Sequence, residues 1–152
     1  MESPETAPTP LLQATLEALT KELRIESRVL FTGNQSNVVP WLQAFDLFCL
    51  PSYANEGVPQ ALMQAMACGL PVVTTPVGSI AEIVQDGDTG LLVEPENPVA
   101  LRAAIERLLA DAPLRARLGA RAREAALQRF GEDQMVQRML DQFMAVTRAA
   151  RR

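Results

Sequence analysis

Short apolar runs alternate with helical segments in the stretch that decides the fold, residues 47–93, LFCLPSYANEGVPQALMQAMACGLPVVTTPVGSIAEIVQDGDTGLLV. This stretch predicts strands at 47–50, 71–75 and 90–93, and helices at 60–68 and about 80–84. The strands are apolar without alternation, which is typical of a parallel sheet covered on both faces and connected by right-handed crossovers. The stretch therefore predicts a three-layer α/β/α, Rossmann-like parallel sheet.

The residues before this stretch extend the pattern by one more unit. Residues 29–31, Val-Leu-Phe, predict a fourth strand that stops at Gly33, followed by a short helix from about residue 39. Four leucines spaced three and four apart over residues 12–23 predict a surface helix that ends near Arg24 and buries one face. Residues 1–10 contain three prolines and predict a disordered tail. We therefore expect a single domain over residues 11–152.

The residues after this stretch are helical in pattern and form a C-terminal tail. Helices are expected at about 98–110, 113–130 and 132–151, with Pro98 and Pro113 in first turns. The side chains expected to face the core are Leu101, Ile105, Leu108, Leu109, Leu114, Leu118, Ala122 and Ala125. The last helix has an apolar stripe that this domain or another must cover, formed by Met135, Met139, Leu140, Phe143 and Val146.

Composition removes several classes of chemistry. The chain has 152 residues, 48% of them apolar, with 14 basic and 18 acidic side chains and no histidine. Histidine bases, Ser-His-Asp and Cys-His nucleophiles and histidine-ligated zinc are therefore excluded. Residues 29–97 contain seven acidic and no basic residues, whereas residues 98–152 contain 11 arginines. A nucleic-acid surface needs cations, which residues 29–97 lack. The arginines of residues 98–152 fall at scattered helical positions that favour a solvated helix face over an RNA or membrane surface, so no nucleic-acid partner is expected.

The two cysteines and the apolar runs indicate the compartment. Cys49 and Cys68 show no CxxC spacing, which favours two buried free thiols in a reducing compartment and predicts no metal site. No apolar run approaches the roughly 20 residues of a membrane span, and no signal-type segment follows Met1. A cytoplasmic protein without a transmembrane segment is expected.

Ligands of open parallel sheets bind beyond the carboxyl ends of the strands, near helix N-termini. That rule selects the loops 32–38, 51–60 and 75–80. In the middle loop Glu56 precedes Gly57, which permits close approach of a ligand to the main chain. Gln60 and Gln64 share one face of the helix that follows, opposite an apolar face formed by Leu62, Ala65 and Met66.

These residue types suit a polyhydroxylated ligand with a phosphate group. Glu56 can accept hydrogen bonds from sugar hydroxyls, Gln64 can donate or accept at a ribose, and the helix N-terminus favours phosphate. The plainer alternative is a solvated loop glutamate beside a glutamine pair without a role. The residues alone leave both interpretations open.

Residues 29–93 closely resemble the donor-side half of the second domain of GT-B glycosyltransferases, in the family 4, group 1 type of retaining enzymes. The pieces that match are RVLFTG, DLFCLPS, EGVPQALMQAMACGLPVVTTPVGS and DGDTGLLVEP, in the family's order and spacing. The flanking helices also look like those of the family. The resemblance implies a partial GT-B C-terminal domain that binds a nucleotide sugar as substrate and uses no cofactor or obligatory metal.

The resemblance also implies roles for individual residues. The family has two glutamates separated by seven residues, and the first matches Glu56, which would contact hydroxyls of the donor sugar together with Gly57, Val58 and Gln60. The second glutamate is replaced by Gln64, which would hold the ribose hydroxyls less strongly because an amide is neutral. Gly33, Asn37 and Val38 would lie against the nucleobase. No residue is assigned a catalytic role.

The sequence departs from the family in two further respects. Val58 and Pro59 replace a Phe-Gly pair, and Pro59 removes one main-chain donor. The early strands, the Gly-rich turn and the Arg/Lys pair that neutralises the diphosphate are not found in this sequence. The edges of the sheet at 29–31 and 47–50 would then lack neighbours, so we expect them to pair with each other or to form a homodimer.

Two functions from different classes follow. The first is the donor-binding part of a retaining glycosyltransferase of bacterial surface glycan or lipopolysaccharide biosynthesis. This part is expected to be inactive without an N-terminal acceptor domain. Peripheral contact at the inner membrane is a further expectation. The second is a non-catalytic Rossmann-like binding or dimerisation module. A sugar-nucleotide epimerase is disfavoured because the chain has no histidine, and a phospho-acceptor receiver domain because Asp46 precedes its strand.

Overall fold

The computed structural model describes residues 10–54 and 56–149, and the expected tail at 1–10 lies, except for Pro10, outside this part. The chain divides into two compact units between Val38 and Val39. The first unit contains helix α1 (Pro10–Glu22) and the 3-10 turn η1 (Glu26–Arg28). The second unit contains the sheet and the remaining helices, and it is the part that bears the strand-tip loops.

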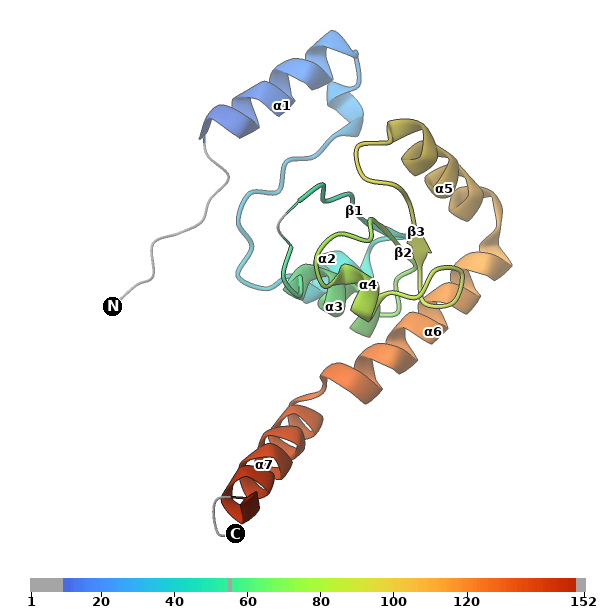
Figure 1. Cartoon of the computed structure of the whole chain (residues 1–152). Coiled ribbons are helices and arrows are strands. Elements are labelled where there is room, and N and C mark those ends of the chain that lie inside the picture. The colour runs from blue at the N-terminus through green and yellow to red at the C-terminus, as the bar shows by residue number, and fades with distance from the viewer. Residues whose placement is uncertain (1–9, 55, 150–152) are drawn as a thin grey trace. The chain divides into compact units, whose positions relative to one another are not determined.

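The sheet of the second unit has three short parallel strands (Figure 1). They are β1 (Phe48–Leu50), β2 (Val72–Thr74) and β3 (Leu91–Leu92), in the order β1-β2-β3. Cys49 pairs with Val73, and Val73 pairs with Leu91, so the carboxyl ends of all three strands meet at one edge. The parallel α/β architecture expected from residues 47–93 is confirmed.

Helices cover the sheet and supply most of its core. They are α2 (Val39–Gln43), α3 (Gln60–Ala67), α4 (Ile80–Ile83), α5 (Pro98–Ala110) and α6 (Ala112–Phe130). All three residues of β2 are fully buried, as expected for a central strand covered on both faces. Val73 packs with Leu91 against Leu108 and Leu118 of α5 and α6. Each such side chain contributes roughly 1.5–3 kcal/mol by its burial.

The boundaries of α5 and α6 follow from two side-chain caps. The Oδ1 atom of Asn97 accepts from the N–H of Ala100 at 2.9 Å, and that of Asp111 accepts from Leu114 at 2.8 Å. Proline follows in both first turns, where its missing N–H costs no hydrogen bond. Further along α6, a Cβ on Gly119 would overlap the carbonyl oxygen of Gly69, so only glycine permits this helix to approach the turn before β2.

The prediction of a fourth strand at residues 29–31 is wrong. In the described part of the chain these residues belong to no ladder, and the Leu30 side chain is 74% exposed. Their apolar, β-branched character favours extended backbone, which Val29 adopts with φ −115° and ψ 126°. A strand also needs a partner for its main-chain groups, and β1 pairs with β2 alone. Residues 29–31 and 47–50 belong to different units, so their pairing within one chain and dimerisation both stay predictions.

One predicted buried face is exposed. The leucines at 12, 16 and 19 of α1 and Leu23, which follows it, are 42–56% exposed and do not form the buried face expected of that helix. The last helix, α7 (Glu132–Ala149), follows the end of α6 (Figure 1). Its apolar stripe, expected to be covered by this domain or another, is exposed in this chain. Leu109 is exposed as well, and Ala125 is only half-buried because Ala126 occupies the buried position. Periodicity identifies an apolar face but not the surface that covers it.

No helix in the described ranges is long and apolar enough to cross a membrane.

Candidate functional site

The loops that follow the three strands meet at one edge of the sheet. The loop after β1 covers residues 51–59, the loop after β2 covers 75–79, and the loop after β3 covers 93–97. Ligands of parallel sheets bind at this edge because helix N-termini open toward it. Two of these three loops were selected from the sequence. The third expected loop, 32–38, belongs to the first unit.

The loop after β1 is tied to the end of β2 by side-chain hydrogen bonds. The hydroxyl of Thr74 donates to the carbonyl of Leu50 at 2.8 Å, and the hydroxyl of Thr75 donates to the carbonyl of Ser52. Both threonines are almost completely buried. Buried hydroxyls are costly without partners, so these bonds fix the start of the loop firmly to the sheet.

Glu56 is held at both its side chain and its main chain. The hydroxyl of Ser52 donates to Glu56 Oε1 at 2.5 Å, and the N–H of Ser79 points to the Glu56 carbonyl at 3.4 Å. Gly78 lies against the same carbonyl with φ +54°, and a Cβ there would overlap the Glu56 oxygen. The half-buried Glu56 is therefore fixed by the loop after β2.

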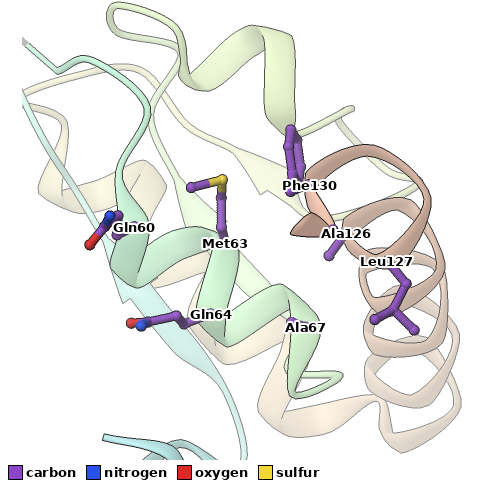
Figure 2. Close-up of a pocket in the computed structure, with 8 residues that line it drawn as sticks. Gln60, Met63, Gln64, Ala67, Ala126, Leu127 and Phe130 are labelled. Atoms are coloured by element: carbon purple, nitrogen blue, oxygen red, sulfur yellow. The ribbon is translucent and has the colours of Figure 1, made fainter. Parts of the chain in front are cut away.

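Helix α3 begins directly after this loop and presents the expected faces. Leu62, Ala65 and Met66 are fully buried, whereas Gln60 and Gln64 are exposed. Figure 2 shows both amides projecting from the same side of α3, away from α6. Pro59, which precedes the helix, has no side-chain acceptor, and the first N–H groups of a helix have no partner within it. These groups are suited to bind an anion.

Gly57 and Val58 lie between Glu56 and α3 on the open side of the loop. Both residues are exposed, and a Cβ on Gly57 would meet nothing within 4 Å. The main chain here can therefore be approached by a ligand. The structure thus places Glu56, Gly57, Val58, Gln60 and Gln64 in one continuous, accessible stretch at the strand tips.

A pocket of about 180 Å³ opens at the same edge of the sheet. Pro51, Thr75 and Val93, which directly follow the three strands, line it. Glu94, Glu96, Asn97, Pro98 and Leu101 complete its lining, and Glu56 does not line it. The loop after β3 was not among the loops selected from the sequence. Its position directly after the strand expected at 90–93 could have identified it.

A larger pocket of about 390 Å³ lies between α3 and the end of α6 (Figure 2). Its lining is mostly apolar and comprises Gln60, Met63, Gln64, Ala67, Ala126, Leu127, Phe130 and Gly131. It lies beside the candidate site rather than at the strand tips. We assign the site to the strand tips because the tethered carboxylate and the loops after all three strands meet there.

The residues expected at the nucleobase lie in the first unit. Gly33 adopts φ +63° and lines a pocket of about 270 Å³ with Gln13, Leu16, Leu30, Phe31 and Thr32. Asn37 is exposed and Val38 is half-buried. The role of these three residues stays a prediction.

Three arginines of α6 are engaged at the opposite edge of the sheet, whereas Arg129 donates to the carbonyl of Glu82 on α4. Arg117 donates to the carbonyl of Gly87, and Arg121 forms a two-point ion pair with Asp88 at 3.0 and 3.1 Å. Arg123 donates to the carbonyl of Ala67. The acceptor residues precede β2 or β3 and thus mark the amino ends of the strands. The strand-tip loops themselves contain no Lys or Arg.

The described residues give little support to metal or thiol chemistry at this site. Residues 10–54 and 56–149 contain no group of three or more His, Cys, Asp or Glu that could hold a metal ion. Both cysteines are free and half-buried, and burial raises the pKa of the Cys49 thiol. A raised pKa disfavours the nucleophilic thiolate at neutral pH. Main-chain N–H groups, Glu56 and the two amides of α3 are available to a ligand in the loop after β1 and the helix that follows it.

Comparisons with known proteins show the family to which the chain is similar. A family model described as "Glycosyl transferases group 1" matches residues 11–125. An N-acetyl-alpha-D-glucosaminyl L-malate synthase of Bacillus anthracis is 41% identical over 122 residues, which are 80% of this chain and 32% of that protein. The lipopolysaccharide core biosynthesis glycosyltransferase LpsE of Rhizobium meliloti is 32% identical over 118 residues, which are 78% and 34% of the two chains.

A solved structure shows the same fold. The crystal structure of Anabaena HepE in complex with UDP-glucose matches with a TM-score of 0.85 and 27% identity, over 91% of this chain and 38% of that chain. This chain therefore spans about a third of the length of the curated relatives that it matches.

Proposed function

Because the chain belongs to the group 1 family of glycosyl transferases, we propose that it forms the part that binds the nucleotide-sugar donor. The observation that supports this most directly is the position of Glu56. Its carboxylate is tethered at the carboxyl edge of a parallel sheet, immediately before a helix that presents Gln60 and Gln64. Carboxylate oxygens accept from sugar hydroxyls, and the helix N-terminus favours the diphosphate.

The donor would lie along the loop after β1. Glu56 accepts from hydroxyls of the sugar, with the main chain of Gly57, Val58 and Gln60 beside it, and Gln64 holds the ribose. Gly33, Asn37 and Val38 contact the base. The UDP-glucose complex of HepE supports a nucleoside diphosphate sugar as the class of ligand. In this proposal the donor is a substrate, and no separate cofactor or metal is used.

Transfer itself requires more than this chain supplies. The leaving diphosphate needs neutralising charge, and residues 29–97 contain no Lys or Arg. A helix end offers only about 0.3–2 kcal/mol toward an anion. We therefore propose that this chain alone is inactive, and that it acts in a retaining transferase together with an acceptor-binding domain and the Arg/Lys pair that the family has early in its second domain.

The relatives suggest a biological setting. LpsE of Rhizobium meliloti acts in lipopolysaccharide core biosynthesis, which supports a role in a bacterial surface glycan. We therefore also propose a cytoplasmic location with peripheral contact at the inner membrane.

A titration tests the proposal. The chain is titrated with UDP-glucose, UDP-N-acetylglucosamine and GDP-mannose by calorimetry, and at least one of these ligands should bind saturably. Glu56→Ala should weaken that binding at least about tenfold, because a hydrogen bond to a charged group is lost. Glu82→Ala on α4 is the matched control and should bind as the parent does. Absence of binding by all three sugars up to millimolar concentration would favour the non-catalytic binding or dimerisation module.

A further inference from the structure

The carboxylate of Glu56 has a hydrogen-bond donor within its own loop. Ser52 lies four residues earlier, and its hydroxyl donates to Glu56 Oε1 at 2.5 Å. Both residues are half-buried. A short bond to a carboxylate in a partly desolvated loop is a strong orienting contact, roughly twice as strong as a neutral pair.

Ser52 is itself fixed from the core of the sheet. The hydroxyl of Thr75 donates to the Ser52 carbonyl, and the Thr75 side chain is 1% exposed. Thr75 directly follows β2, whose residues are all fully buried. Two hydrogen bonds therefore link the end of the central strand to the Glu56 carboxylate, one made to the main chain of Ser52 and the other donated by its side chain.

The neighbouring threonine makes the same kind of bond to a different place. Thr74 donates to the carbonyl of Leu50, which is the last residue of β1. The two threonines are adjacent, buried and alike in chemistry, but only the acceptor of Thr75 lies in the loop that bears Glu56. This pair separates an effect on the Glu56 loop from a general effect on the sheet.

From these contacts we infer that Ser52 is a positioning residue that orients the Glu56 carboxylate toward the donor sugar, with Thr75 acting through Ser52. The inference rests on the proposed function for the role of Glu56. One carboxylate has about four acceptor positions, so a bond from Ser52 leaves several for sugar hydroxyls. A carboxylate that is already oriented loses less side-chain freedom when the sugar binds.

The inference predicts an effect on the sugar and not on the nucleotide. UDP lacks the group that Glu56 is proposed to contact, whereas UDP-glucose has it. Ser52→Ala should weaken UDP-glucose binding about three- to tenfold and leave UDP binding unchanged, as calorimetry measures. A merely structural role would weaken both ligands alike, and that result would overturn the inference.

Two further variants test the route of the effect. Ser52→Thr retains the hydroxyl and should stay within about twofold of the parent. If it binds UDP-glucose as weakly as Ser52→Ala does, the hydroxyl has no positioning role. Thr75→Val should reproduce the selective loss of UDP-glucose binding, and its matched control Thr74→Val should not. Equal losses in the two valine variants would contradict a route through the loop.

A measurement without ligand separates this inference from the proposed function. Side-chain couplings of Glu56 in NMR spectra should show one dominant rotamer in the parent chain and averaged rotamers in Ser52→Ala. Unchanged couplings would overturn the inference whatever the chain binds. If the couplings average as expected but the parent chain binds neither UDP nor UDP-glucose, the proposed function fails while the contact of Ser52 with Glu56 is supported.

Discussion

At the scale of single residues, Gln64 distinguishes this chain from the pattern of the family that it resembles. Its amide is exposed on the same face of α3 as Gln60, four residues earlier. An amide has one acceptor oxygen and no charge, whereas a carboxylate can accept from both ribose hydroxyls at once. The proposed ribose site is therefore weaker than it would be with glutamate.

Gln64→Glu should strengthen binding of both UDP and UDP-glucose by about three- to tenfold, because the ribose is common to the two ligands and a charged acceptor replaces a neutral one. Calorimetry measures both affinities. Gln43→Glu on α2 makes the same change of charge and serves as the control. Unchanged or weaker binding in Gln64→Glu would remove Gln64 from the ribose site.

At the scale of elements, α6 holds the amino edge of the sheet through its arginines. The guanidinium of Arg121 donates two hydrogen bonds to the carboxylate of Asp88, and Arg117 donates to the main chain of the same turn before β3. The hydrogen bond from Arg121 is the main reason that the pKa of Asp88 lies below its ordinary value, despite a smaller opposing effect of desolvation. Both groups are exposed, so this ion pair contributes modestly.

The ion pair predicts a pH-dependent contribution to stability. The pKa of Asp88 is lowered in the folded state, so its contribution is present above the unfolded value of about 3.9 and is lost as the pH falls through the folded pKa. Asp88→Asn should therefore unfold at a modestly lower temperature than the parent at about pH 7, and the difference should vanish toward about pH 2.5.

Thermal unfolding of both chains across this pH range measures the effect. Asp141→Asn on α7 is the control, because the Asp141 carboxylate accepts a hydrogen bond from the neutral amide of Gln137 rather than from a guanidinium. A difference between Asp88→Asn and the parent that stays constant with pH would show that the ion pair is not its source.

At the scale of the whole molecule, two helices leave apolar faces uncovered. The stripe of α7 is exposed throughout, with the Phe143 side chain 65% exposed, and the leucine face of α1 is exposed as well. Contiguous apolar surface of this kind marks an interaction site or a tendency to associate. The expectation that another domain covers the α7 stripe stays a prediction. When no such domain is bound, a second copy of the chain can cover the stripe instead.

The chain should therefore self-associate as its concentration rises. Met139→Glu combined with Phe143→Glu should shift sedimentation profiles toward the monomer without lowering the unfolding temperature, because both side chains are exposed. Gln137→Glu combined with Gln142→Glu adds the same charge at polar positions and should associate as the parent does. A parent chain that remains monomeric at every concentration would contradict this prediction.

Local pattern was sufficient for much of the fold. Apolar runs without alternation predicted the three parallel strands, and a period of 3.6 predicted the buried face of α3, because both depend on residues close together in sequence. The family resemblance, drawn from the blocks between residues 28 and 95, is confirmed by the family model over 11–125. The same blocks pointed to Glu56 and Gln64 as candidates, and their proposed roles remain to be tested.

Contacts between distant residues were decided only by the tertiary structure. Residues 29–31 are apolar and extended but form no strand, since a strand depends on a partner that local sequence does not specify. The bond from Thr75 to Ser52 spans 23 residues, and that from Arg123 to Ala67 spans 56. Apolar runs and helical periodicity by themselves identified the three strands of the sheet and the helices that cover it. Only the folding of the loop after β2 against the loop after β1 decided how Glu56 is held, because those hydrogen bonds exist only once the two strands are paired.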